Sequence, residues 1–240
     1  MSARSTLGPI DWDAVDLVVF DVDGTLYDAQ RLRRKMLGLL LAAAWQTRST
    51  QTLRVLRTFR SVREALGDEA HPEFMTLQYT RTAACTGCDV TTVRAMVTDW
   101  MEQRPLPWLR ACRWPQVDAL FDALRIAGKQ VAVWSDYPAR EKLQALGLQA
   151  DLVVAATDPE IARLKPDPRG LLALLQCTGV PATRALMVGD RLDRDAEAAR
   201  RAGVPALVLA RRAPTGVRGF SRYDDPLFMP LRAAPALALA

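Results

Sequence analysis

The sequence predicts an α/β protein, a doubly wound parallel sheet with an inserted all-helical domain, and three observations support this. Residues 17–20 form an unbroken apolar run with two valines, which is typical of a strand buried on both faces of a parallel sheet. From residue 114 onward, helices alternate with short apolar strands, and this alternation predicts a parallel sheet covered by helices on both faces. Residues 29–104 contain no convincing strand and predict successive helices.

The elements of the second half are separated by glycines. Each predicted helix stops directly before a glycine, which readily adopts the left-handed conformation that ends many helices. The predicted helices and their glycines are 115–127 with Gly128, 138–146 with Gly147, 168–178 with Gly179, and 193–202 with Gly203. The predicted strands are 130–134, 152–155, 185–188 and 206–209.

The helical insertion predicts a division into domains. Helix breaks are expected at 48–50, 67–72 and 86–89, where glycine, proline and helix-capping residues gather. The predicted organisation is an α/β core of residues 1–28 and 105–212, a helical cap of 29–104, an irregular tail of 213–240, and hinges at 28–34 and 104–114.

Composition restricts the class of partner. A chain of 240 residues, half of them hydrophobic, can bury one sizeable core and a second small one. The net charge of +5 is spread without a block of lysine and arginine, so we expect no nucleic-acid arm, and a small anionic substrate fits this balance. No stretch approaches the roughly eighteen apolar residues of a membrane span.

Location is predicted from the N-terminus and the cysteines. Residues 1–13 carry one arginine, no apolar segment and acids soon after, so we expect no signal peptide. Four unevenly placed cysteines do not make a disulfide framework in a chain of this length. A reduced cytoplasmic location is therefore the prediction.

Two acids follow the first strand. Asp21 and Asp23 are two residues apart on extended backbone, so their side chains share a face. Ligands bind at the carboxyl ends of the strands in open α/β sheets. Because adjacent carboxylates repel each other unless a cation lies between them, the pair predicts a metal site, a proton-transfer role, or both.

Polar residues also follow the later strands. Ser135 and Asp136 follow the 130–134 strand, and Lys165 lies in a Leu-Lys-Pro-Asp-Pro segment after the 152–155 strand. Asp190 and Asp195 follow the 185–188 strand and Gly189. The carboxyl ends of parallel strands meet at one edge, so the sequence predicts acids, a hydroxyl and a lysine gathered there.

With these motifs in this order, the chain resembles the haloacid dehalogenase (HAD) superfamily. The matching motifs are Asp21-Val22-Asp23-Gly24-Thr25, Ser135, Lys165 in Lys-Pro-Asp-Pro, and Gly189-Asp190 with Asp195. Over residues 15–210 the chain is similar to the phosphatase-like branch, phosphoglycolate phosphatase-like, with a helical cap after the first strand. The resemblance implies a Rossmann-like HAD core.

The resemblance also implies roles. Asp21 is expected to be the nucleophile that forms an aspartyl-phosphate, and Asp23 the general acid and base. Ser135, helped by the amide of Asp136, is expected to bind a phosphoryl oxygen, and Lys165 to offset the negative charge. Mg²⁺ is expected to bind Asp21, the backbone carbonyl of Asp23, Asp190 and Asp195.

The function predicted in this way is hydrolysis of a small phosphorylated metabolite by a Mg²⁺-dependent phosphatase. The acid at Asp23 favours phosphoester chemistry, because a dehalogenase has no leaving oxygen to protonate. Arg191 departs from the pattern, since many relatives carry a small hydroxyl residue there. A phosphomutase of the same superfamily is the alternative, and a non-catalytic binding protein on the same fold a weaker one.

The sequence leaves the role of two further patterns undecided. Cys85 and Cys88 have the spacing of a redox or zinc motif, but no second pair at a suitable spacing accompanies them. Arginines at 54, 57, 60 and 63 recur every three residues, which predicts a solvated helix face and, less strongly, a basic stripe that attracts a phosphorylated substrate.

Overall fold

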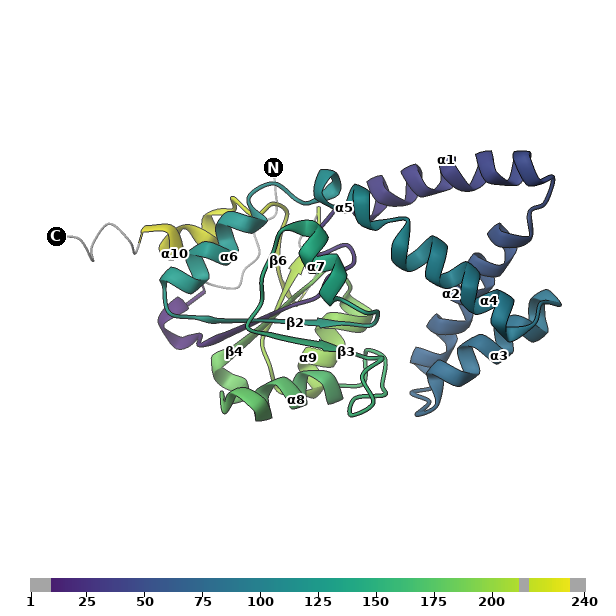
Figure 1. Cartoon of the computed structure of the whole chain (residues 1–240). Helices are drawn as coiled ribbons and strands as arrows, with labels where there is room; N and C mark the ends of the chain where they lie inside the picture. Colours follow the sequence, from purple (N-terminus) through teal and green to yellow (C-terminus); the bar gives the residue numbers. More distant parts are fainter. Residues whose placement is uncertain (1–9, 212–215, 234–240) are drawn as a thin grey trace.

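The computed structural model describes residues 10–211 and 216–233, and within them it contains a six-stranded parallel sheet (Figure 1). The strand order is β3-β2-β1-β4-β5-β6. The strands are β1 (Leu17–Phe20), β2 (Gln130–Ser135), β3 (Leu152–Ala155), β4 (Ala185–Gly189), β5 (Ala206–Leu209) and β6 (Arg218–Phe220). Helices follow the strands along the chain, so the predicted doubly wound α/β fold is confirmed.

The two faces of the sheet are covered by different helices. Val18 and Phe20 of β1 belong to one buried cluster, with α6 (Val117–Ile126) and α7 (Arg140–Leu146). Leu17 and Val19 belong to a second cluster, with α8 (Arg169–Thr178) and α9 (Glu197–Arg201). Alternate residues of a strand face opposite sides, so the apolar run of β1 supplies both layers.

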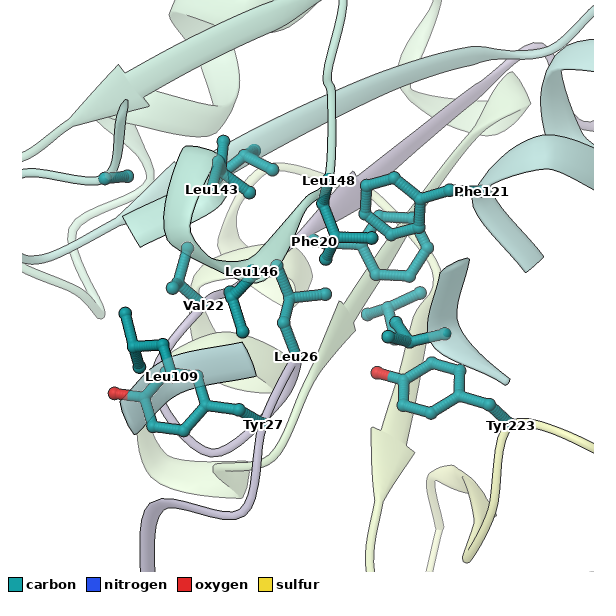
Figure 2. Packing of buried hydrophobic residues seen from close by; sticks show 14 of the residues in the cluster. Phe20, Val22, Leu26, Tyr27, Leu109, Phe121, Leu143, Leu146, Leu148 and Tyr223 are labelled. Atoms are coloured by element: carbon teal, nitrogen blue, oxygen red, sulfur yellow. The ribbon is translucent and has the colours of Figure 1, made fainter. Parts of the chain in front are cut away.

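Aromatic packing anchors the first cluster. Phe20 lies against Phe121 of α6 with ring centroids 4.7 Å apart (Figure 2). Leu26 and Leu146, also drawn there, continue the same apolar layer toward Tyr27 and Leu109. The layer therefore extends from beneath the sheet to the segment that follows β1.

The predicted helix ends are present. All four glycines that close the predicted helices have positive φ, between 68° and 71°. The observed helices and strands begin and end within one or two residues of the predicted bounds, apart from the 193–202 helix. That segment begins as a π-helical turn, η4 (Leu192–Ala196), and continues as α9.

The inserted segment forms a helical cap beside the sheet (Figure 1). Its elements are α1 (Ala29–Thr47), α2 (Gln51–Asp68), α3 (Phe74–Thr86), α4 (Val90–Val97) and the π-helical segment η2 (Thr98–Gln103), followed by α5 (Leu106–Cys112). The three predicted helix breaks separate α1 from α2, α2 from α3 and α3 from α4. Division into cap and core at residues 29 and 104 stays a prediction.

The two connections between cap and core run side by side. Tyr27 and Arg113 form an isolated antiparallel bridge, and the Asp28 amide donates to the Cys112 carbonyl at 2.9 Å. Since α1 begins at Ala29 and α5 covers much of 104–114, the predicted hinges are mostly helical. Non-helical backbone is concentrated at residues 27–28 and 113–114.

The prediction of an irregular tail over 213–240 is wrong for the described residues 218–233. They form β6 at the edge of the sheet, the 3₁₀ turn η5 (Pro226–Phe228) and the short helix α10 (Met229–Ala233). Phe220, Tyr223 and Phe228 bury their rings against one another and the core, and this packing orders a segment too short to show periodicity. Residues 213–215 and 234–240 of the predicted tail lie outside the described residues.

The structure bears on two further predictions, the absence of a membrane span and the absence of a signal peptide, only for the described residues. In the described part, no helix has both the length and the apolar character needed to cross a membrane. The expected absence of a signal peptide concerns residues 1–13, and 1–9 of these lie outside the described residues.

Candidate active site

Three neighbouring parallel strands end at the same edge of the sheet, and residues at or directly after their ends form the floor of the site. Phe20 of β1 is in register with Val133 of β2 and with Val188 of β4. Asp21 directly follows β1. Ser135 ends β2 and Asp190 directly follows β4, so parallel pairing brings the three polar side chains to the same edge.

Lys165 joins the acids of this floor. Its Nζ lies 2.6 Å from Oδ1 of Asp21, 2.7 Å from Oδ1 of Asp195 and 3.0 Å from the Trp134 carbonyl oxygen. The lysine side chain is buried, and burial lowers its pKa, but the carboxylates of Asp195 and Asp21 outweigh this and raise it. Lys165 is therefore a fixed positive charge at Asp21.

The second oxygen of Asp21 is also held. Buried Thr25 donates its hydroxyl to Oδ2 of Asp21 at 3.0 Å. Burial raises the pKa of Asp21 to about 6, with the Lys165 ammonium acting in the opposite direction and the Asp195 carboxylate adding to the rise. The carboxyl group is thus oriented by two donors and still ionises below neutral pH.

The turn after Asp21 is braced from two distant parts of the chain. Gly24 has a φ of +104°, and a Cβ at this position would lie 2.1 Å from Oδ2 of Asp190, so only glycine fits. The Trp114 indole donates to the Gly24 carbonyl at 3.0 Å, and the Tyr223 hydroxyl donates to the Thr25 carbonyl at 2.7 Å. The C-terminal segment therefore supports the turn that follows Asp21.

Asp23 points to a different set of partners. Both its carboxylate oxygens lie 2.7 Å from Nζ of Lys142, and one also accepts a hydrogen bond from the Tyr27 hydroxyl. Burial raises the pKa of Asp23, but the Lys142 ammonium and the Tyr27 hydroxyl outweigh it and hold this pKa below its ordinary value. Asp21 and Asp23 are therefore held by separate cations.

Three carboxylates are arranged to hold a cation. One oxygen each from Asp21, Asp190 and Asp195 can be chosen so that all lie within 4.8 Å of one another. Oδ1 of Asp190 is buried and has no hydrogen-bond partner among the described residues. Burial, together with Asp21 and Asp195, raises the pKa of Asp190 to about 8. An orphaned buried carboxylate beside two others suits a hard cation such as Mg²⁺.

The predicted phosphate-binding residues flank this floor. Ser135 is buried, and its Oγ accepts a hydrogen bond from the Tyr137 amide at 3.2 Å. The carboxylate of Asp136 accepts from the Lys165 amide at 3.0 Å, and this contact ties the lysine loop to the end of β2. Burial raises the pKa of Asp136.

Arg63 corrects the prediction of a solvated arginine stripe. Arg54, Arg57 and Arg60 of α2 are exposed, but Arg63 is buried. It donates to Gln78 Oε1 at 2.6 Å and to the Asp136 carbonyl, and its guanidinium lies 3.9 Å from the Tyr137 ring centroid. At 3.6 residues per turn, nine residues rotate the helix by about half a turn, so Arg63 faces away from Arg54 toward the core.

Arg194 ties the cap to the core near Lys165. Its side chain is buried and donates to the Lys165 carbonyl at 2.9 Å and to Asp68 at 2.7 Å, at the end of α2. Arg191 donates to Glu64 of the same helix at 2.8 Å. A Cβ on Gly67 would lie 2.6 Å from the Arg194 guanidinium, so a glycine allows this close approach. Arg191, which departs from the family pattern, therefore takes part in the contact between core and cap.

A cavity of about 530 Å³ lies between the cap and the floor. All the predicted site residues line it except Ser135, and residues of α1, α2, η2 and α5 form the cap side. The structure thus places Asp21, Asp190, Asp195 and Lys165 close together, whereas the carboxylate of Asp23 contacts Lys142 instead. The catalytic roles themselves stay predictions.

Lys142, Tyr27 and Arg194 were missed by sequence reasoning. For Lys142 the sequence held a signal. It lies in the first turn of α7, where the helix dipole disfavours a positive charge, so a lysine at this position is not explained by helix stability. No local pattern marks Tyr27 or Arg194 as site residues. Tyr27 donates to Asp23, four residues earlier, whereas Arg194 contacts Lys165 of the core and Asp68 of the cap, which lie far from it in the sequence.

The cysteine pair lies away from this site. Cys85 and Cys88 are free thiols at the end of α3 and in the loop that follows, and neither lines the cavity. No cluster of metal-ligand side chains in residues 10–211 and 216–233 includes either cysteine.

Two curated phosphatases are similar to this chain in sequence. The phosphoglycolate phosphatase of Rhodospirillum rubrum is 37% identical over 128 residues, which are 50% of this chain and 53% of that protein. This match spans about half the length of the relative. The glyceraldehyde 3-phosphate phosphatase of Methanopyrus kandleri is 29% identical over 204 residues, covering 82% of this chain and 84% of that protein.

Solved structures agree on the fold. The 2-haloacid dehalogenase of Pseudomonas syringae superposes with a TM-score of 0.61 at 20% identity, covering 94% of this chain and 98% of that one. At this identity the likeness shows the fold alone.

The family model of haloacid dehalogenase-like hydrolases matches residues 15–203, the span that carries all the motifs described above. The chain therefore belongs to the haloacid dehalogenase-like hydrolase family.

Proposed function

We propose that this hydrolase is a Mg²⁺-dependent phosphatase that hydrolyses a phosphomonoester through an aspartyl-phosphate. The observation that carries the proposal is the contact of Lys165 with Asp21 beside the cluster of Asp21, Asp190 and Asp195. A charged lysine and a cation-binding cluster around one carboxylate suit phosphoryl transfer, which depends mainly on positioning and charge stabilisation. The curated relatives above are named as phosphatases, which supports the same reaction class.

Asp21 is the nucleophile in this proposal. A carboxylate oxygen of Asp21 attacks phosphorus, a phosphorus–oxygen bond to Asp21 forms, and the bond to the leaving oxygen breaks. Lys165 and Thr25 hold the carboxyl group in one orientation, and its pKa of about 6 leaves it ionised at neutral pH.

Asp23 transfers the protons. It donates a proton to the leaving oxygen in the first half-reaction, then removes one from the water that attacks phosphorus and breaks the bond to Asp21. In the arrangement without substrate, Lys142 and Tyr27 hold Asp23 as a carboxylate. The negative charge of an arriving phosphate favours the protonated form that the first half-reaction requires.

Residues of the floor of the site stabilise the negative charge on the phosphoryl oxygens. Ser135 and the amide of Asp136 donate hydrogen bonds to a phosphoryl oxygen, and Lys165 places its charge between the phosphate and Asp21. Asp21, Asp190, Asp195 and the Asp23 carbonyl would hold Mg²⁺, which when bound supplies positive charge that offsets that of the phosphate and carboxylates. Closure of the cap over a bound substrate would exclude bulk water from the reaction.

Phosphate release from a panel of phosphomonoesters, measured with MgCl₂ and with EDTA, tests this proposal. We expect release with MgCl₂, none with EDTA, and loss of activity by at least about 10³-fold in Asp21→Asn. No release from any ester with MgCl₂, or full activity in Asp21→Asn, contradicts the proposal. An isomer of the ester in place of free phosphate would assign the chain as a phosphomutase. A cytoplasmic location remains a prediction from the cysteine content.

A further inference from the structure

The cap side of the cavity carries many apolar side chains beside its charged ones. Leu40 of α1, Leu53 of α2, Met101 of η2 and Leu106 of α5 line it and are partly exposed. Such walls give favourable contacts to apolar groups and none to hydroxyls or other polar groups, whose loss of water they do not offset. The volume of about 530 Å³ lies within the range of sites for drug-sized ligands.

Three arginines line the same cavity without an acidic partner. Arg33 of α1 and Arg57 and Arg60 of α2 are exposed, and none forms an ion pair or hydrogen bond with another described residue. The other cations that line the cavity are engaged, namely Arg63, Lys142, Lys165, Arg191 and Arg194. Glu102 also lines the cavity and leaves three positive charges against one negative.

We propose that the substrate is a phosphomonoester with an apolar body, aromatic or alkyl, that ends in a second anionic group. This inference rests on the proposed phosphatase function. The phosphate meets Asp21 and Lys165, the body packs on the apolar cap walls, and the second anion binds Arg33, Arg57 and Arg60. Arginine suits this role because its planar donor group matches a carboxylate or a phosphate. A two-carbon glycolyl group would leave most of the apolar walls without contact.

Four esters separate the parts of this inference. Phenyl phosphate has the apolar body and one anion, and phosphoglycolate has two anions without the body. 4-Carboxyphenyl phosphate and 1,4-phenylene bisphosphate have both features, and they distinguish a carboxylate from a phosphate as the second group. We expect kcat/KM for at least one of the last two to exceed that of phenyl phosphate and of phosphoglycolate by about tenfold or more, as for a hydrogen bond to a charged group.

Arginine variants identify the site. We expect Arg57→Gln and Arg60→Gln to lower the ratio of kcat/KM for 4-carboxyphenyl phosphate to that for phenyl phosphate by about tenfold, mainly through KM. Arg34→Gln is the matched control, because Arg34 lies on α1, is exposed and does not line the cavity, and the change in charge is the same. We expect it to leave the ratio unchanged.

The outcomes are distinguishable. Equal loss for both esters in Arg57→Gln and Arg60→Gln means general attraction of anions, and overturns the inference. So does a kcat/KM in the unmodified enzyme that is no higher for either ester with a second anion than for phenyl phosphate, with hydrolysis of phenyl phosphate leaving the phosphatase function intact. Calorimetric binding of phenyl phosphate, 4-carboxyphenyl phosphate and 1,4-phenylene bisphosphate to Asp21→Asn with MgCl₂ decides the inference even if no ester is hydrolysed. Equal affinity for all three would contradict it.

Discussion

Lys142 binds both carboxylate oxygens of Asp23 at 2.7 Å across 119 residues of sequence. The two residues come from different strand ends, since Asp23 follows β1 and Lys142 lies in the first turn of α7. The Nζ of Lys142 is also 5.1 Å from the Tyr137 ring centroid. Lys142 therefore fixes where the proposed acid and base lies before substrate arrives.

Replacement of Lys142 should impair proton transfer more than substrate binding. We expect Lys142→Met to lower kcat by about 10–100-fold, with a larger loss for alkyl phosphates than for aryl phosphates, because poor leaving groups depend more on the general acid. Steady-state kinetics on the two ester types measures this, and Lys142→Arg should recover part of the loss. Lys129→Met, with the same change of charge at the opposite end of β2, is the control. Equal loss for both ester types would argue against a link to Asp23.

The stability of the metal-free protein should decrease as the pH rises, because of Asp190. Its pKa is about 8 in the folded protein against an ordinary value of 3.8, so between about pH 4 and pH 8 the folded state holds a proton that the unfolded chain has released. Stability is therefore lost as the pH rises through this window. Mg²⁺ binds the ionised carboxylates, so the rise in Tm caused by MgCl₂ should be greater at pH 8 than at pH 6.

Asp190→Asn provides the control for this prediction. Without the buried charge, we expect the metal-free variant to have a higher Tm than the unmodified protein at pH 8, a weaker pH dependence and little response to MgCl₂. Calorimetric unfolding in EDTA and in MgCl₂ measures all three. A metal-free Tm that falls equally in both proteins between pH 6 and pH 8 would show that Asp190 is not the source.

Gly67 and Gly38 are two helical glycines of the cap with opposite expected responses to alanine. A Cβ on Gly67 meets the Arg194 guanidinium at 2.6 Å and the Lys165 carbonyl oxygen at 3.2 Å, whereas nothing lies within 4 Å of one on Gly38. We expect Gly67→Ala to push α2 from the core and lower kcat/KM by about tenfold or more. Gly38→Ala should raise the free energy of unfolding by about 0.5–1 kcal/mol without changing activity. Unaltered kinetics in Gly67→Ala would mean that the close contact is not needed for catalysis.

Arg194 should control closure of the cap. We expect Arg194→Met to weaken the contact with Asp68 and leave the Lys165 carbonyl without its donor, so that KM rises and kcat falls by about tenfold. Small-angle scattering should show a larger radius of gyration than in the unmodified protein. Arg200→Met is the matched control, because Arg200 is exposed and pairs only with Glu197 among the described residues. An unchanged radius together with unchanged kinetics would remove Arg194 from this role.

The sequence by itself determined the α/β fold and the residues that gather on the floor of the candidate site. An apolar run followed by acids predicts a buried strand and its ligand-binding end from local pattern alone, as at residues 17–23. Glycines marked the helix ends in the same way. The short strand β6 escaped prediction, because its order comes from Phe220, Tyr223 and Phe228 packing on a core already formed by other elements.

Only the tertiary structure decided how the acids differ. Asp21 and Asp23 are the same residue type two positions apart, yet Lys165 holds one and Lys142 the other, and Asp190 is left with an unpaired buried oxygen among the described residues. The direction of a pKa shift depends on burial and on charges brought together from distant positions, which local patterns do not contain. For the same reason the contacts of Arg63 with Asp136 and of Arg194 with Asp68 form only when the cap packs on the sheet edge.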